Sequence, residues 1–216
     1  MPPSDDLVRA PKQARSQQSL DRALDATLTL LIERGSGVFT LKDVARLAGV
    51  STGSIYGRVA GKDDLIRVAH AREMRRIDLE TTAAFARVPQ GVAGFEDAVR
   101  LAVQALAELL QRNAQVLAPF MLLGRDDPVI SERGGTAHLR MQEAFIGSLQ
   151  GRTDAHGRAQ SEGALRWACT VVWSVLARQL GLGNDREAAA DYELDEVVTR
   201  LTAMLAAYLV QGSEPT

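Results

Sequence analysis

Residues 39–62, which read FTLKDVARLAGVSTGSIYGRVAGK, contain the start and stop signals of two short helices separated by a tight turn. Thr40 is suited to cap the first helix with its hydroxyl, and Asp43 stands where the acid of a capping box is expected. Gly49 supplies the positive φ that favours a helix end, and Ser51 can cap the next helix. The apolar residues of the first helix share one helical face: Leu41, Val44, Ala45 and Ala48. The pattern predicts two helices joined by a three-residue turn.

The second helix is predicted over residues 52–59, with Ile55 and Val59 on its inner side. Two short helices with such a turn form a helix-turn-helix, whose second helix lies in the DNA major groove. The outer side of this helix consists of Thr52, Gly53, Ser54, Tyr56, Gly57 and Arg58. Small outer residues allow DNA to approach the backbone closely. The motif indicates DNA binding, and the alternative is a three-helix packing unit without that role.

The stretch resembles the TetR family of transcriptional repressors. The matching residues lie within residues 16–66 and are Thr40, Val44, Ala45, Ala48, Gly49, Val50, Ser51, Gly53, Ser54, Ile55, Tyr56, Val59, Lys62 and Leu65. The family often carries His where this chain has Arg58, which keeps a hydrogen-bond donor but adds reach and permanent charge. The operator sequence of a relative is therefore not transferable to this chain.

The resemblance implies an all-α fold, in which an N-terminal helix-turn-helix domain is joined by a long fourth helix to a larger helical domain. That larger domain is expected to bind a ligand and to form a homodimer. The expected function is that of a repressor on a near-palindromic double-stranded DNA operator, released by a small, mostly apolar effector. Two recognition helices of a dimer are then expected about 34–36 Å apart.

Three groups of residues are predicted to contact DNA. Thr52, Gly53, Ser54 and Arg58, together with the small Gly57, face the base edges, whereas Thr40, Tyr56 and Lys62 hold phosphates. Lys12 and Arg15 belong to a flexible basic arm over residues 1–15, which is either a DNA-binding arm or a solubilising tail. Tyr56 has the alternative of packing partly in the core.

The charge of the chain is concentrated at one end. The whole chain has a formal charge of −2, yet residues 9–76 carry 13 Lys and Arg against 7 Asp and Glu, a net charge of +6. All three lysines, Lys12, Lys42 and Lys62, fall in this region. Only this end is expected to attract a phosphate backbone.

Composition favours an all-helical intracellular protein. Aromatic residues make up only 5% of the chain, and few segments alternate with the period of a strand. The single cysteine, Cys169, excludes an intrachain disulfide. No signal peptide or membrane span is recognisable, so we expect a soluble, cytoplasmic protein. His70, His138 and His156 are not spaced as metal ligands, and no catalytic motif is present, so neither an enzyme nor a cofactor is expected.

Periodicity and breaker residues predict the remaining helices. They are expected over residues 16–34, 62–87, 94–113, 117–122, 128–149, 158–180 and 187–210. The predicted domains are the arm at 1–15, the helix-turn-helix domain at 16–61 and the ligand-binding and dimerisation domain at 62–212. The glycine pair at 134–135 is expected to make the start of its helix irregular.

Ligand and interface residues are inferred mainly from the resemblance. The ligand candidates are Phe120, Met121, His138, Met141, Phe145, Trp167 and Trp173, each of which is individually more typical of a core. The dimer candidates are Leu165, Cys169, Val172, Leu176, Val198, Leu201 and Leu205, because the last two helices have apolar stripes wider than one partner covers. Cys169 is a small core residue or, alternatively, a redox switch.

Two other functions remain open at this point. The chain is alternatively an architectural DNA-binding dimer that responds to no ligand. It is otherwise a helical small-molecule-binding or hydrolytic protein with a vestigial DNA-binding head. Tight binding to one short palindrome would separate a regulator from both.

Overall fold

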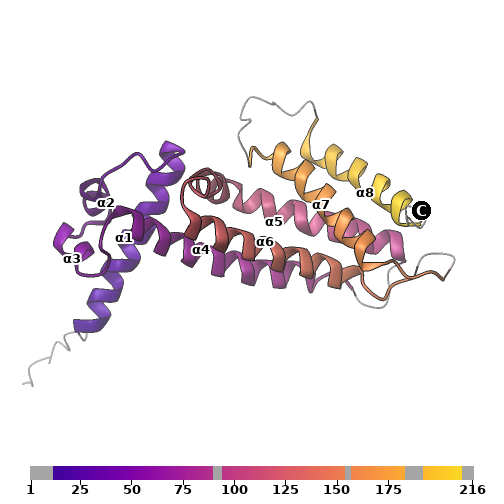
Figure 1. Cartoon of the computed structure of the whole chain (residues 1–216), viewed down its shortest axis with the longest axis horizontal. Helices are drawn as coiled ribbons and strands as arrows, with labels where there is room; N and C mark the ends of the chain where they lie inside the picture. Colours follow the sequence, from indigo (N-terminus) through magenta and orange to yellow (C-terminus); the bar gives the residue numbers. More distant parts are fainter. Residues whose placement is uncertain (1–11, 90–93, 154–156, 183–191, 211–216) are drawn as a thin grey trace, which may run out of the picture. The chain divides into compact units, whose positions relative to one another are not determined.

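A computed structural model describes residues 12–89, 94–153, 157–182 and 192–210. Within these residues the chain forms eight α-helices and no strand, apart from an isolated bridge between Thr153 and Ala159 (Figure 1). The helices are α1 Lys12–Arg34, α2 Leu41–Ala48, α3 Thr52–Tyr56, α4 Lys62–Phe85, α5 Phe95–Leu123, α6 Pro128–Leu149, α7 Glu162–Gln179 and α8 Leu194–Val210. The predicted all-α fold is confirmed. No helix in the described part of the chain is long and apolar enough to cross a membrane.

The chain divides into two compact units, Met1–His70 and Ala71–Thr216. The first contains α1, α2, α3 and the start of α4, and the second contains the rest of α4 with α5 to α8. Because α1 begins at Lys12, the prediction that Lys12 and Arg15 belong to a flexible arm is wrong: both residues are helical. The boundaries predicted at residues 61 and 212 stay predictions.

The first unit is a small three-helix core. Helix α1 packs against both α2 and α3, and α2 packs against α3. The side chains of Leu31, Val44, Ile55 and Leu65 are all almost completely buried in this unit. Each such side chain stabilises the fold by about 1.5–3 kcal/mol through removal of apolar surface from water. The short helix α3 is therefore held by packing rather than by its own length.

The second unit is built around α5, which packs against α6, α7 and α8. Its core contains Val103 and Leu106 of α5, Phe145 of α6, Leu165 of α7 and Leu205 of α8. All five are at most 2% exposed. These apolar faces explain why the sequence periodicity was visible in each segment.

Some helix boundaries differ from the predicted ones. The break expected near residue 113 is absent, because α5 continues through Pro119 to Leu123. Pro119 and Phe120 are both buried, so packing offsets the backbone hydrogen bond that proline cannot donate. Gly134 and Gly135 lie in a continuous α6 rather than in an irregular segment. Helix α7 begins only after its N-cap Ser161, and the predicted start of the last helix at 187 lies outside the described residues.

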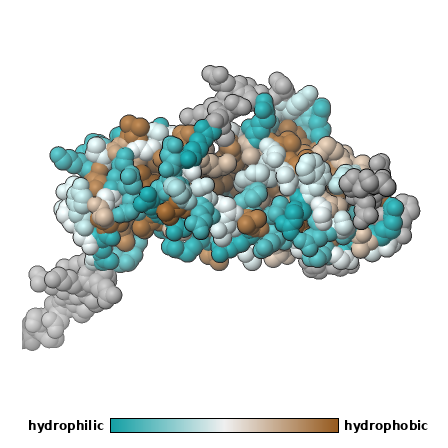
Figure 2. Space-filling model, viewed as in Figure 1, coloured by the Kyte–Doolittle hydropathy of each residue, from teal (hydrophilic) through white to brown (hydrophobic). Residues whose placement is uncertain are grey.

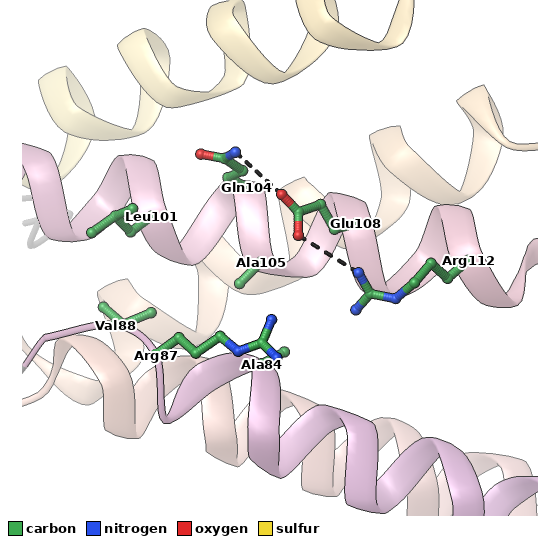
Figure 3. Close-up of a pocket in the computed structure, with 8 residues that line it drawn as sticks. All are labelled: Ala84, Arg87, Val88, Leu101, Gln104, Ala105, Glu108 and Arg112. Carbon is green, nitrogen blue, oxygen red and sulfur yellow. Dashed lines mark hydrogen bonds and ion pairs between the residues drawn. The ribbon is translucent and has the colours of Figure 1, made fainter.

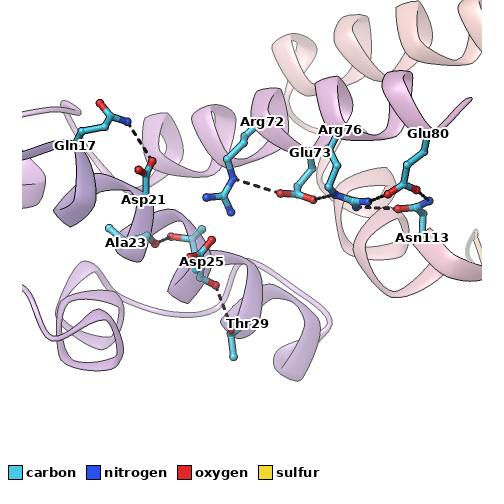
Figure 4. A network of polar contacts seen from close by, with 11 residues as sticks. Gln17, Asp21, Ala23, Asp25, Thr29, Arg72, Glu73, Arg76, Glu80 and Asn113 are labelled. Carbon is cyan, nitrogen blue, oxygen red and sulfur yellow. Dashed lines mark hydrogen bonds and ion pairs between the residues drawn. The ribbon is translucent and has the colours of Figure 1, made fainter. Parts of the chain in front are cut away.

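A polar network joins α4 to α5 inside the second unit (Figure 4). The Arg76 guanidinium donates to Glu73 at 2.7 Å, to Glu80 at 2.6 Å and to the side-chain oxygen of Asn113 at 2.8 Å. The buried Asn113 amide in turn donates to Glu80 at 2.9 Å and to the Leu109 carbonyl at 2.9 Å. The Asn113 hydrogen bond, followed by the Arg76 charge, lowers the pKa of Glu80 despite partial burial. Asn113 and Glu73 are buried, whereas Arg76 and Glu80 are partly exposed, so this partly buried network links α4 to α5 through paired donors and acceptors.

Candidate nucleic-acid interface

The start of α2 is fixed by a complete capping box. The Thr40 hydroxyl accepts from the Asp43 backbone N–H at 3.2 Å and donates to Asp43 Oδ2 at 2.8 Å. The Thr40 backbone N–H also donates to Asp43 Oδ2, at 2.9 Å. Both donors of Thr40 are therefore used inside the protein, where they fix the start of α2, and the contact of Thr40 with a phosphate stays a prediction.

This capping box predicts an acid-dependent loss of stability. The hydrogen bonds from Thr40 lower the pKa of Asp43 below its ordinary 3.8, and Arg34 and Arg46 add to the effect. Because the folded-state pKa is the lower one, the stabilisation is present above about pH 4 and is lost as the pH falls through the folded value. We expect Asp43→Asn to flatten the acid limb of thermal unfolding midpoints measured between pH 3 and pH 7. An acid limb as steep in the variant as in the parent protein would contradict this origin.

The turn and the second helix follow the predicted local chemistry. Gly49 has a φ of 62° at the end of α2, in the left-handed region that favours glycine. The Ser51 hydroxyl accepts from the Ser54 backbone N–H at 3.1 Å and so caps α3. Helix α3 ends at Tyr56, whereas the sequence pattern predicted it to reach Val59. Gly57 follows as the C-cap, and Arg58 lies in the loop beyond it.

The predicted DNA-contacting residues of α3 and its following loop lie on the exposed side. Ile55 and Val59 are buried, as predicted for the inner side. Tyr56 is 59% exposed, which removes the alternative that its ring is part of the core. The other predicted members are exposed or partly exposed: Thr52, Gly53, Ser54, Gly57 and Arg58.

Gly53 is not required by the packing of the protein. A Cβ atom at this position would meet only the Ser51 Oγ, at 3.9 Å, which is an ordinary contact. The backbone φ of Gly53 is not in the left-handed region. Neither space within the described chain nor backbone conformation therefore demands glycine at this position.

Two predicted basic contacts already bind groups of the protein. Lys62 Nζ donates to the Gly37 carbonyl at 2.9 Å and lies 5.7 Å from the centroid of the Phe39 ring. An ammonium has three donors, so two remain for a phosphate. The Arg58 guanidinium donates to the Ser16 hydroxyl of α1. Sequence reasoning missed Ser16 because no local pattern links two residues 42 positions apart.

The structure places most ligand candidates in the core or on the surface. Phe120, Met141 and Phe145 are buried, whereas Met121 and Trp167 are exposed. His138 of α6 and Trp173 of α7 meet edge to face, with ring centroids 4.6 Å apart, and both are partly buried. Burial lowers the pKa of His138, so its imidazole is neutral at neutral pH.

A shallow groove lies elsewhere in the second unit, between the end of α4 and α5 (Figure 3). Its volume is about 170 Å³, and its lining residues are Ala84, Arg87, Val88, Leu101, Gln104, Ala105, Glu108 and Arg112. Arg112 pairs with Glu108 at 3.6 Å, and Gln104 donates to Glu108 at 3.2 Å. Ligand sites usually enclose about 300–1,000 Å³. None of the seven ligand candidates lines this groove.

The predicted dimer residues require a correction. Six of them, Leu165, Cys169, Val172, Leu176, Leu201 and Leu205, are at most 5% exposed within a single chain. Val198 is partly buried against the same core. The six are therefore core residues of the second unit, because the inner faces of α7 and α8 pack on α5, and they have no free surface for a second copy.

Cys169 is expected to be chemically inert in the folded protein. Burial raises the pKa of its thiol to about 12, although the nearby Arg166 charge acts in the opposite direction. Because the thiolate is the reactive form, its population at pH 8 is negligible. We expect no alkylation by iodoacetamide at pH 8, as judged by intact mass, until urea unfolds the chain. Rapid stoichiometric labelling without denaturant would restore the redox-switch interpretation.

Comparison with known proteins agrees with this architecture. Residues 23–69 match the sequence pattern of the family described as "Bacterial regulatory proteins, tetR family". A curated relative, the HTH-type transcriptional regulator SrpR from Pseudomonas putida, is 29% identical over 69 residues. That alignment spans 32% of this chain and 32% of SrpR, so the chain matches about a third of the length of this relative.

Solved structures share the fold over nearly the whole chain. A TetR-family transcriptional regulator from Mesorhizobium loti has a TM-score of 0.70 at 16% identity, covering 91% of this chain and 98% of its own. A transcriptional regulator from Rhodococcus sp. has a TM-score of 0.64 at 19% identity, covering 92% and 99%. The fatty acid degradation regulator FadR from Bacillus halodurans has a TM-score of 0.59 at 17% identity, covering 92% and 96%. At these identities the likeness concerns the fold alone.

Proposed function

We infer that this chain, as a member of the TetR family of bacterial regulatory proteins, is a DNA-binding transcriptional regulator. We propose that it acts as a cytoplasmic homodimeric repressor. The observation that carries the proposal is the exposed face of α3, in a helix-turn-helix whose two helices both begin at a side-chain cap, Thr40 for α2 and Ser51 for α3. This face and the loop that follows α3 combine hydroxyls, glycines, one phenol and one guanidinium, which are groups suited to base edges and phosphates. A two-fold axis would then place two such faces on the half-sites of a near-palindromic operator.

The proposed dimer surface is the outer side of α7 and α8. Three large apolar side chains are exposed there in the single chain: Trp167 (57%), Val175 (38%) and Met204 (49%). On the face drawn in Figure 2, exposed apolar side chains lie between hydrophilic ones. Aromatic residues and Met are enriched in subunit interfaces. We therefore propose this outer set as the interface in place of the seven predicted residues, six of which are buried in the core and one of which is partly buried.

The proposed effector is a small, mostly apolar molecule. The His138–Trp173 pair between α6 and α7 is the part of the predicted ligand set that supports such a site, because both rings are only partly buried. A neutral imidazole can donate or accept one hydrogen bond while the indole supplies apolar surface. If the effector favours a head spacing that does not fit the operator, a coupling of about 1–3 kcal/mol lowers operator affinity about 5- to 150-fold.

The proposed function is tested by selecting duplexes from a random-sequence library with the full-length protein. We expect enrichment of one near-palindromic sequence, whose binding weakens as salt rises because phosphate contacts release counterions. Absence of any enriched sequence would reject a sequence-specific regulator. Small molecules that raise the unfolding temperature of the protein are then tested for an effect on DNA binding. If none of them changes the affinity for the enriched duplex, a ligand-independent DNA-binding dimer is favoured.

Gly53→Ala should separate DNA approach from folding. Alanine is the better helix former by about 0.5–1 kcal/mol, so the variant should be at least as stable as the parent protein. We expect its affinity for the selected duplex to fall by about 1–3 kcal/mol, because the added methyl group separates α3 from the base edges. Thermal unfolding and fluorescence anisotropy measure the two effects. Unchanged DNA affinity would show that α3 does not approach DNA at Gly53.

A further inference from the structure

The guanidinium of Arg58 is held by one hydroxyl group of α1. Arg58 Nε donates to Ser16 Oγ at 3.0 Å, and Arg58 Nη2 donates to the same oxygen. Both residues belong to the first unit, in which α1 packs against α3. The contact is at the surface, where Arg58 is exposed and Ser16 is partly exposed. A contact between exposed side chains of this kind contributes little to stability.

The geometry of the contact decides which hydrogen-bond groups remain. A guanidinium has five N–H donors and no acceptor, and a serine hydroxyl has one donor and two acceptor lone pairs. Since the Nε and Nη2 edge of Arg58 faces Ser16, the two N–H groups of Nη1 and the second N–H of Nη2 remain. Because Ser16 Oγ accepts twice, its own O–H remains as a donor. The pair therefore presents donors only.

We propose that Ser16 is a positioning residue that holds Arg58, so that the pair offers only hydrogen-bond donors to two acceptor atoms of DNA. We call this arrangement of Ser16 and Arg58 the clasp. The clasp follows α3 directly, because Arg58 comes immediately after the C-cap Gly57. Its ligand chemistry is a pair of acceptors, supplied either by phosphate oxygens or by the O6 and N7 atoms of a guanine. This inference rests on the proposed DNA-binding function. It identifies Ser16 as the residue that orients the guanidinium of Arg58 for its predicted contact with DNA.

Holding the arginine has a defined energetic effect. A free arginine side chain loses about 2 kcal/mol of rotamer entropy when it becomes fixed in a complex. A guanidinium that is already held by Ser16 has less freedom left to lose when it meets its acceptors. Removal of the serine hydroxyl should thus weaken the binding of DNA by Arg58. The loss should be smaller than the loss on removal of the Arg58 side chain itself.

The test is a double-mutant cycle with Ser16→Ala and Arg58→Ala, measured with the full-length protein. The probes are the duplex enriched from the random library and a shuffled duplex of the same composition. We expect Arg58→Ala to weaken the selected duplex about 5- to 150-fold. Ser16→Ala should weaken it about 3- to 10-fold in the parent protein. In the Arg58→Ala background, the same serine substitution should change affinity by less than about twofold, because its partner is absent.

Three variants provide controls. Ser16→Thr keeps a hydroxyl at the same place and should retain parent affinity within about twofold. Gln17→Ala removes the adjacent polar side chain of α1, which donates to Asp21 of its own helix at 3.1 Å, and should leave DNA affinity unchanged. Arg58→Lys keeps the charge but cannot offer two edges, so it should lose most of the effect.

The outcomes separate the clasp from the wider proposal. The positioning role would be overturned if Ser16→Ala weakened DNA binding equally in the parent protein and in the Arg58→Ala protein. It would also be overturned if Ser16→Ala left the affinity of the parent protein unchanged or increased it. In all three cases the regulator proposal would stand. Failure of the parent protein to enrich any duplex would reject the regulator proposal and the clasp together. Losses confined to the selected duplex identify guanine as the source of the acceptors, and equal losses on the shuffled duplex identify phosphate.

Discussion

Replacing Phe145 with alanine is expected to lower the free energy of unfolding by about 3–5 kcal/mol. The Phe145 side chain is fully buried in α6, and its ring meets Phe85 of α4 edge to face with centroids 6.0 Å apart. Truncation removes the transfer free energy of the ring and leaves a cavity that the packed helices cannot close. Such a loss would be a large part of the total stability of a domain of this size.

Urea unfolding followed by circular dichroism measures this effect. Leu139→Ala is the matched control, since Leu139 lies on the same helix but is 55% exposed, and its replacement should change stability by no more than about 0.5 kcal/mol. The comparison also tests the original assignment of Phe145 to an effector pocket. If Phe145→Ala lowered the free energy of unfolding as little as the control does, the ring would not be part of a tightly packed core. The prediction that Phe145 lines an effector pocket would then be favoured again.

Local signals explain why the helix-turn-helix was predictable. Thr40, Gly49 and Ser51 act through groups within a few residues of themselves, so a short stretch of sequence contains the whole cause of each cap. The all-α fold was predictable for a related reason, because helical periodicity records which side of each helix is apolar. The same periodicity does not record what covers the apolar side.

That missing information accounts for the main corrections. The wide apolar stripes of the last two helices predict a dimer interface at Leu165 and Leu205, but the structure covers both side chains with α5 of the same chain. The Arg76–Asn113 and Arg58–Ser16 hydrogen bonds join residues 37 and 42 positions apart. No spacing rule connects such partners, since their meeting depends on how whole helices pack.

Introducing a charge on the outer side of α7 and α8 should abolish the proposed dimer and most of the operator affinity. Trp167→Asp and Met204→Asp place carboxylates on side chains that are 57% and 49% exposed in the single chain. Each substitution occurs twice across a two-fold interface, and burial of an unpaired charge there is strongly unfavourable. Loss of one interface anchor costs about 2 kcal/mol or more, so the dimer constant should fall at least about 30-fold for either variant.

Operator affinity should follow the dimer because one head makes too few contacts for a tight specific site. Light scattering coupled to size-exclusion chromatography measures the oligomeric state, and anisotropy with the selected duplex measures binding. Leu139→Asp is the control, as it adds the same charge at an exposed apolar position of α6, outside the proposed surface. Because all three positions are exposed in the single chain, each variant can fold as a monomer. A dimer that persists in both variants would place the subunit interface elsewhere, whereas monomers with full operator affinity would show that one head is sufficient.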